Sequence, residues 1–243
     1  MPSIHNAVHV DWVRTETAAT EVQLDRCCRL LAPDEYARMA RFMFERDRRQ
    51  YLLTRALVRT MLSRYAPVLP TEWRFGTNQH GRPEILNRPP GVRDLRFNLS
   101  HTEGLIACAV TVAREVGVDV EYVGRLLVYD VADRFFAPRE AAALRALPAA
   151  DQPLMFFDFW TLKESYIKAR GLGLAMPLAD FAFRLDPPGA PVISFESTLD
   201  DDPAAWQFVQ SWPSPMHRLA LAVRRTGPDV DVRIREVESP VAP

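Results

Sequence analysis

Residues 116–122 read VGVDVEY, a run in which apolar residues alternate with other residues at a period of two. Successive side chains of a β-strand point to opposite faces. One face therefore carries the valines and Tyr122, and the other carries Gly117, Asp119 and Glu121. Two carboxylates this close repel each other, which raises one pKa unless a cation binds between them. The acidic face is either an ordinary solvated strand face or part of an oxygen-rich cation site.

A third carboxylate stands in an unusual place in residues 155–171, MFFDFWTLKESYIKARG. Helical spacing puts Glu164 in one stripe with three large hydrophobic residues. An ionised Glu in such a stripe is costly unless it is paired or binds a metal. An i,i+4 ion pair with Lys168 is one explanation, worth about 0.3–0.5 kcal/mol if exposed. The other explanation is a site that holds metal and phosphate together, with Lys163 and Lys168 on its two sides.

The bulk composition excludes several classes of protein. The chain has 243 residues, 48% hydrophobic and 25% charged, and a formal net charge of −1, which argues against a globally basic nucleic-acid binder. Its three cysteines form neither a disulfide framework nor a zinc motif. We find no targeting segment at the N-terminus and no apolar run of the roughly 20 residues that span a bilayer. We therefore expect a cytoplasmic protein.

The periodicity predicts an α+β protein. We expect helices within residues 33–64, 128–136, 138–147 and 152–170, and a strand over 8–12. Residues 105–112 and 116–123 are expected to form a hairpin, and the segments after residue 180 alternate like antiparallel strands. The proline-rich end, ESPVAP, is expected to be disordered. We predict two subdomains that divide near residues 112–118.

Four motifs in order resemble those of the Sfp-type 4′-phosphopantetheinyl transferases. GVDVE at residues 117–121 resembles the family's G-[IV]-D-[IV]-E strand, and WTLKESYIK at 160–168 resembles its W-x-x-K-E-[SA]-x-x-K. Upstream, FNLSH at 97–101 and GRP at 81–83 are similar to the family's FN[IL]SH and GKP. The resemblance covers roughly residues 30–185.

The resemblance implies a fold and a reaction. These enzymes move the 4′-phosphopantetheine arm of coenzyme A to a serine hydroxyl of an apo acyl or peptidyl carrier protein, and 3′,5′-ADP leaves. Their fold is a pair of similar, pseudo-symmetric subdomains with coenzyme A and Mg²⁺ in the cleft. We accordingly expect an N-terminal subdomain over 1–114, a C-terminal subdomain over 115–243, and a monomer.

The resemblance also assigns roles at the metal site. It implies that Asp119, Glu121 and Glu164 bind Mg²⁺ together with diphosphate oxygens and water. Glu164 is our first candidate for the base that accepts the serine proton, either directly or through a metal-bound water, since the hydrophobic residues around it would raise its pKa. Lys168 and Lys163 are expected to hold the diphosphate.

The nucleotide of coenzyme A needs a basic pocket. By resemblance, Ser100 and His101 contact the nucleotide or its 3′-phosphate, Arg82 takes the place of the lysine in GKP, and Arg38 matches a basic position in the N-terminal helix. Two positions depart from the pattern: Glu35 stands where some relatives carry lysine, and Tyr51 where some carry a small hydroxyl residue. These departures concern the 3′-phosphate contacts.

The carrier protein and two alternative functions remain open at this point. Arg125, Arg134 and Arg139 are candidates for binding an acidic carrier surface, and fatty acid, polyketide and non-ribosomal peptide carriers all fit. The same carboxylates could serve a Mg²⁺-dependent diphosphate hydrolase with water as the nucleophile. A non-catalytic module that binds coenzyme A or a carrier is the other alternative, although all three expected metal ligands are present.

Overall fold

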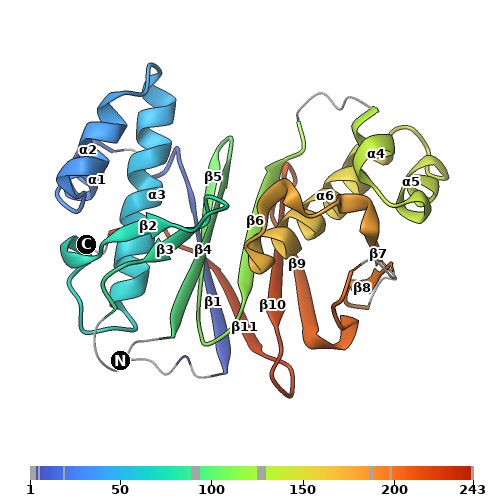
Figure 1. The fold of residues 1–243 in the computed structure, drawn as a ribbon. Helices are drawn as coiled ribbons and strands as arrows, with labels where there is room; N and C mark the ends of the chain where they lie inside the picture. The colour runs from blue at the N-terminus through green and yellow to red at the C-terminus, as the bar shows by residue number, and fades with distance from the viewer. Residues whose placement is uncertain are drawn as a thin grey trace. The chain divides into compact units, whose positions relative to one another are not determined.

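The computed structural model divides the chain into two compact units, which are Met1–Arg114 with Asp231–Pro243 and Glu115–Val230 (Figure 1). The residues that the structure describes are Ile4, 6–18, 20–88, 94–124, 130–185, 189–196 and 199–241. Each unit has its own hydrophobic core. Each combines helices with mainly antiparallel strands, which confirms the predicted α+β class.

The first unit contains a four-stranded sheet in the order β11-β1-β5-β4 and a small two-stranded sheet, β2-β3. Its strands are β1 (Ala7–Arg14), β2 (Phe75–Thr77), β3 (Pro83–Ile85), β4 (Leu95–Thr102), β5 (Leu105–Val112) and β11 (Asp231–Glu236). Its helices are α1 (Glu21–Cys28), α2 (Pro33–Ala40), α3 (Glu45–Ser63) and the 3₁₀ turn η1 (Pro70–Glu72).

Helix α3 supplies most of the helical side of the first core. Its residues Leu53, Leu57 and Met61 are completely buried at helical spacing and lie in one cluster with residues of β4 and β5. Burial of one such side chain contributes about 1.5–3 kcal/mol. The helix is thereby fixed against β4, the strand that carries Ser100 and His101.

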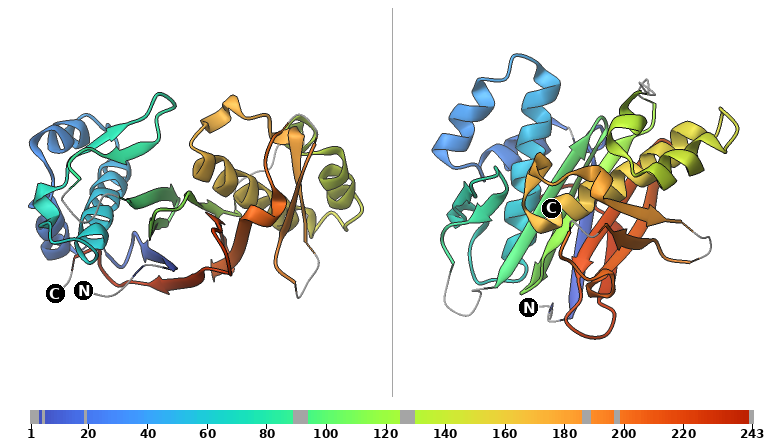
Figure 2. Two further views of the ribbon diagram at one scale, coloured as in Figure 1. Left: turned by 60° about the horizontal axis from the view of Figure 1, so that its bottom comes forward. Right: turned by 45° about the vertical axis from the view of Figure 1, so that its right-hand side comes forward.

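The second unit contains a three-stranded sheet in the order β6-β10-β9 and a two-stranded sheet, β7-β8 (Figure 2). Its strands are β6 (Val116–Tyr122), β7 (Phe181–Arg184), β8 (Val192–Phe195), β9 (Trp206–Ser214) and β10 (His217–Arg224). Its helices are α4 (Asp130–Phe135), α5 (Pro138–Arg145), α6 (Gln152–Arg170) and the 3₁₀ turns η2 (Gly173–Ala175), η3 (Leu178–Asp180) and η4 (Pro203–Ala205).

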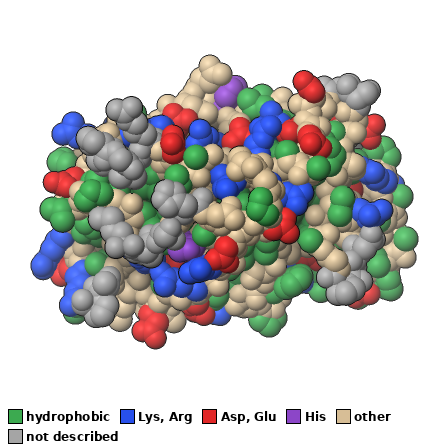
Figure 3. Space-filling view, turned by 90° about the horizontal axis from the view of Figure 1, so that it is seen from below, with side chains coloured by type: hydrophobic (Ala, Val, Ile, Leu, Met, Phe, Trp, Pro, Cys, Tyr) green, Lys and Arg blue, Asp and Glu red, His purple; other side chains and the backbone are tan. Residues whose placement is uncertain are grey.

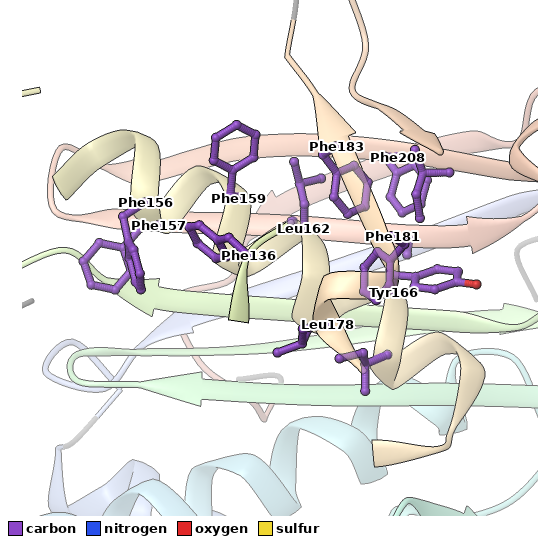
Figure 4. Packing of buried hydrophobic residues seen from close by; sticks show 14 of the residues in the cluster. Phe136, Phe156, Phe157, Phe159, Leu162, Tyr166, Leu178, Phe181, Phe183 and Phe208 are labelled. Atoms are coloured by element: carbon purple, nitrogen blue, oxygen red, sulfur yellow. The ribbon is translucent and has the colours of Figure 1, made fainter. Parts of the chain in front are cut away.

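Aromatic side chains of α6, β7 and β9 dominate the second core (Figure 4). Tyr166 packs edge-on against Phe181 with ring centroids 4.9 Å apart, and Phe183 packs edge-on against Phe208 at 4.8 Å. Such pairs are worth about 0.5–1.5 kcal/mol beyond their buried area.

Helix α6 ends where the sequence predicts. Gly171 takes the left-handed conformation (φ 69°), and its N–H donates a hydrogen bond to the carbonyl of Ile167.

Helix α6 approaches β6 so closely that only glycine fits at residue 117. A Cβ atom built there would overlap the backbone carbonyl of Ser165 and the backbone nitrogen of Ala169. The two elements therefore touch backbone to backbone on the face that also carries Asp119 and Glu121. Both Gly117 and the valines on the opposite face of β6 are buried, so β6 is not a strand with one solvated face.

The predicted hairpin between residues 105–112 and 116–123 is wrong. Strand β5 is hydrogen-bonded on both of its edges, to β1 and to β4, whereas β6 pairs with β10. A central strand has no free edge for a third partner. The hairpin that does form joins β4 to β5 through Glu103 and Gly104, and Gly104 has φ 79°.

The C-terminal segment also differs from the prediction. The chain divides after Arg114, and residues 231–243 belong to the first unit, whereas we expected them in the C-terminal subdomain. Strand β11 runs parallel to β1, so its alternation does not mark an antiparallel strand. The segment ESPVAP, of which the structure describes residues 238–241, is tied down, since Thr60 donates a hydrogen bond of 2.6 Å to the carbonyl of Pro240.

Among the described residues, none of the helices has the length and apolar character needed to cross a membrane. Basic and acidic side chains are interspersed on the face seen in Figure 3. This agrees with the near-zero net charge of the sequence.

We expect Gly117→Ala to destabilise the protein by about 1–3 kcal/mol or more, because two backbones must move to admit one methyl group. Chemical denaturation measures the change in the free energy of unfolding. Gly76→Ala is the matched control, because the added Cβ would meet only the exposed side chain of Leu86, at 2.9 Å. It should cost less than about 1 kcal/mol, and an equal loss in both variants would contradict the close-approach argument.

Candidate active site

The residues predicted for the site lie on both units. Four belong to the first unit, Arg38 on α2, Arg82 just before β3, and Ser100 and His101 on β4. Five belong to the second unit, Asp119 and Glu121 on β6 and Lys163, Glu164 and Lys168 on α6. Each group is therefore described within its own unit.

Strand β6 and helix α6 bring Asp119 and Lys168 into contact. The ammonium of Lys168 lies 2.6 Å from the carboxylate of Asp119 and donates a longer bond of 3.3 Å to the carbonyl of Val118. Asp119 is only 3% exposed. The ion pair of Lys168 with Asp119 thus crosses the contact between helix α6 and strand β6.

Glu164 lies close enough to Asp119 for their charges to interact. Burial raises the pKa of Glu164, and the negative charge of Asp119 raises it further, while Lys168 lowers it. Two carboxylates from segments about forty residues apart therefore share one environment, as the sequence suggested.

Glu121 lies two residues beyond Asp119 on the same face of β6 and is partly exposed. Within the described ranges, no three His, Cys, Asp or Glu side chains are close enough to form a ready-made metal cage. Mg²⁺ usually takes one or two carboxylates, and water and substrate phosphates complete its shell. The Asp119–Glu164 pair fits that chemistry, with Glu121 as a neighbouring oxygen donor.

Lys163 does not fit its predicted role in holding the diphosphate. Its side chain is fully buried, and its ammonium lies 2.7 Å from Glu140. The same ammonium donates to the carbonyls of Leu178 (2.8 Å) and Phe181 (2.6 Å). These three partners use its three N–H donors, so Lys163 fastens the surrounding elements to α6.

The Lys163–Glu140 pair is a structural ion pair of the second core. Burial lowers the pKa of Lys163 to about 8 although Glu140 raises it, and burial likewise raises the pKa of Glu140. Glu140 also accepts hydrogen bonds from the backbone N–H groups of Ala137 and Phe183. Sequence pattern could not predict this pair, because the two residues stand 23 positions apart in different helices.

Ser100 and His101 are adjacent on β4 and point to opposite faces. His101 is exposed and Ser100 is buried. Arg82 lines a cavity of about 110 Å³ together with Arg88 and Arg96. The guanidinium of Arg38 lies 5.8 Å from the ring centroid of Tyr51. The first unit therefore carries basic groups near its expected nucleotide residues.

Glu35 has a structural role that the sequence did not reveal. Its carboxylate is buried, accepts hydrogen bonds from Arg55 (2.6 Å) and Arg59 (2.6 Å), and accepts one from the backbone N–H of Ala32. It therefore fastens α2 to α3. Glu35 is thus an anchor in this chain, and Arg38 lies about one helical turn further along α2.

Comparisons with known proteins decide the family. Residues 115–223 match the model of the 4′-phosphopantetheinyl transferase superfamily, and residues 16–113 match the model of a 4′-phosphopantetheinyl transferase N-terminal region. A 4′-phosphopantetheinyl transferase of Bacillus subtilis is 33% identical over 165 residues, which are 68% of this chain and 71% of that protein. The chain belongs to the 4′-phosphopantetheinyl transferase family.

Two other known proteins also match part of this chain. The 4′-phosphopantetheinyl transferase HetI of Nostoc sp. is 40% identical over 156 residues. The matched region covers 64% of this chain and 65% of HetI. A crystal structure of holo-[acyl-carrier-protein] synthase from Thermotoga maritima matches with a TM-score of 0.38 and 24% identity, over 46% of this chain and 64% of that one.

We expect Lys163→Met to lower the free energy of unfolding by about 3–5 kcal/mol, because it leaves the Glu140 carboxylate buried without its cation. The double variant Lys163→Met/Glu140→Leu should recover part of that loss, since it removes both charges. In the double variant the KM for coenzyme A should stay near its wild-type value. A large rise in this KM together with recovered stability would show that Lys163 binds the cofactor after all.

Proposed function

We propose that this transferase moves the 4′-phosphopantetheine group of coenzyme A to a serine hydroxyl of an apo acyl or peptidyl carrier protein and releases 3′,5′-ADP, with Mg²⁺ as the metal. Family membership supports the reaction class. The observation that carries the assignment of residues is the cluster of Asp119, Glu164 and Lys168 at the contact of β6 with α6.

The reaction exchanges one bond to phosphorus for another. The serine oxygen bonds to the β-phosphorus of the coenzyme A diphosphate, and the bond from that phosphorus to the bridging oxygen breaks, so that 3′,5′-ADP carries away the electron pair. When bound, Mg²⁺ would offset the charge on the diphosphate oxygens. Asp119, Glu121 and Glu164 would hold it, and the ammonium of Lys168 would add a second positive charge beside the same oxygens.

Glu164 is the proposed acceptor of the serine proton. A carboxylate accepts a proton more readily when its pKa is raised toward the working pH. The pKa of Glu164 is raised by burial and by the charge of Asp119. These two causes favour Glu164 over Asp119, which is already paired with Lys168.

The nucleotide of coenzyme A is assigned to the first unit. Arg38 and Arg82 would contact phosphate, since a guanidinium bonds phosphate oxygens bidentately. Ser100 and His101 would contact the nucleotide or its 3′-phosphate. We do not assign Lys163 to coenzyme A, because its three N–H donors are used within the second core.

Mass spectrometry of apo carrier proteins after incubation with coenzyme A and Mg²⁺ tests the reaction. We expect a mass gain of one phosphopantetheine group with the wild-type protein and a loss of roughly a hundredfold or more in rate with Glu164→Gln. Glu115→Gln is the matched control, because Glu115 precedes β6 and pairs with Arg224 at 3.1 Å. It should retain near wild-type rates.

Two outcomes would contradict this proposal. Release of 3′,5′-ADP at a full rate without any carrier would indicate the diphosphate hydrolase instead. Near-normal transfer by a folded Glu164→Gln variant would remove Glu164 from the site.

The carrier is assigned to the surface at Arg134 on α4 and Arg139 at the start of α5. Arg134 and Arg139 are exposed, and Arg125 lies outside the described residues. We expect Arg134→Glu/Arg139→Glu to raise the KM for an acidic carrier several-fold and to leave the KM for coenzyme A unchanged, because charged rim contacts mainly govern encounter. The matched control is Arg145→Glu, an exposed arginine in the last turn of α5. An unchanged carrier KM would place the docking surface elsewhere.

A further inference from the structure

Arg218 on β10 lies directly opposite Glu121 on β6. The antiparallel register pairs the two residues across the strands. Residues paired in this way share a face, with Cβ atoms about 4.5–5.5 Å apart. Arg218 is only 8% exposed, and none of the four family motifs contains it. A buried basic residue therefore stands beside Glu121, the proposed metal ligand nearest the end of β6.

The other side of Arg218 meets helix α6. Its Nε atom lies 2.9 Å from the carboxylate of Asp158. That carboxyl also accepts a hydrogen bond from the indole of Trp212, and the amide of Gln210 donates to the backbone carbonyl of Asp158 at 3.1 Å. Asp158 is thus fixed to two strand residues as well as to Arg218.

The balance of charge decides what Arg218 can do there. An arginine beside a cation site weakens cation binding by repulsion unless a carboxylate neutralises it. Asp158 supplies that carboxylate. With its charge neutralised, Arg218 can still orient a neighbouring carboxylate, because its planar guanidinium carries several N–H donors in a fixed geometry.

We propose that Arg218 is a positioning residue, whose positive charge beside Glu121 orients that carboxylate while Asp158 holds Arg218. This inference rests on the proposed metal site. It extends the site to two residues that are not proposed metal ligands, Arg218 on β10 and Asp158 at the end of the second turn of α6. Loss of such supporting contacts typically weakens metal binding 10- to 100-fold.

Direct titration with Mn²⁺ alone, followed by electron paramagnetic resonance of the free ion, tests the inference without any turnover. We expect Arg218→Met and Asp158→Asn to weaken Mn²⁺ binding about 10- to 100-fold. Arg218→Lys should lie between Arg218→Met and the wild type, because lysine keeps the charge but loses the planar geometry. If Arg218→Met does not fold, the Mn²⁺ affinity of Arg218→Lys tests the inference instead.

A double-mutant cycle separates positioning from general stability. If Arg218 acts through Glu121, adding Arg218→Met to Glu121→Gln should weaken Mn²⁺ binding no further, whereas independent effects would add. Arg224→Met is the matched control. Arg224 also lies on β10 and pairs with a carboxylate of the neighbouring segment, Glu115, but that carboxylate is not a proposed ligand.

The outcomes distinguish this inference from the proposed function. If the wild-type protein binds Mn²⁺ and folded Arg218→Met binds it equally or more tightly, the role of Arg218 is wrong while the metal site stands. If Arg224→Met weakens binding as much, the effect is one of stability and the inference is overturned. If the wild-type protein binds no Mn²⁺, the metal site itself fails and this inference fails with it.

Discussion

The second unit depends on the close approach of α6 to β6. Because residue 117 is glycine, the backbone of the strand touches the backbone of the helix at Ser165 and Ala169. At that separation the carboxylate of Asp119 reaches Lys168 and lies within electrostatic range of Glu164. A methyl group at residue 117 would push the helix away and separate these groups. The glycine of the strand motif is therefore as much a part of the site as its two acids.

The two lysines of the helix motif show how one residue type serves two purposes. Lys163 and Lys168 are five positions apart, and helical geometry turns them to different sides of α6. Lys163 enters the aromatic core, where Glu140 and two carbonyls satisfy it. Lys168 meets the strand and neutralises Asp119. The pair on the core side holds the helix in place, so the pair on the strand side can take part in chemistry.

The strand and the helix that carry the site could be predicted from the sequence, because each depends on the local pattern of residues. The period-two run at residues 116–122 predicted β6, and the helix at 152–170 ended at Gly171 as expected. The approach of Asp119 to Glu164 followed from family motifs.

The remainder depends on pairings between distant segments. Strand β11 pairs with β1, which lies more than two hundred residues earlier in the sequence. Strand β5 is hydrogen-bonded on both edges, to β1 and β4, and local alternation of residues does not identify the partners of a strand. The roles of Glu35 and Glu140 likewise arise from partners on other elements.

Charge pairing explains why so many ionisable groups are tolerated around α6. A buried charge is costly alone and acceptable when a partner and hydrogen bonds compensate it. Cations on or against this helix are paired with carboxylates: Lys163 with Glu140, Lys168 with Asp119, Arg170 with Asp201 and Arg218 with Asp158. Glu164 lies among them, and its raised pKa reflects burial and the nearby negative charge of Asp119. A bound cation would reverse that electrostatic cost, so the arrangement favours the binding of positive charge at Glu164.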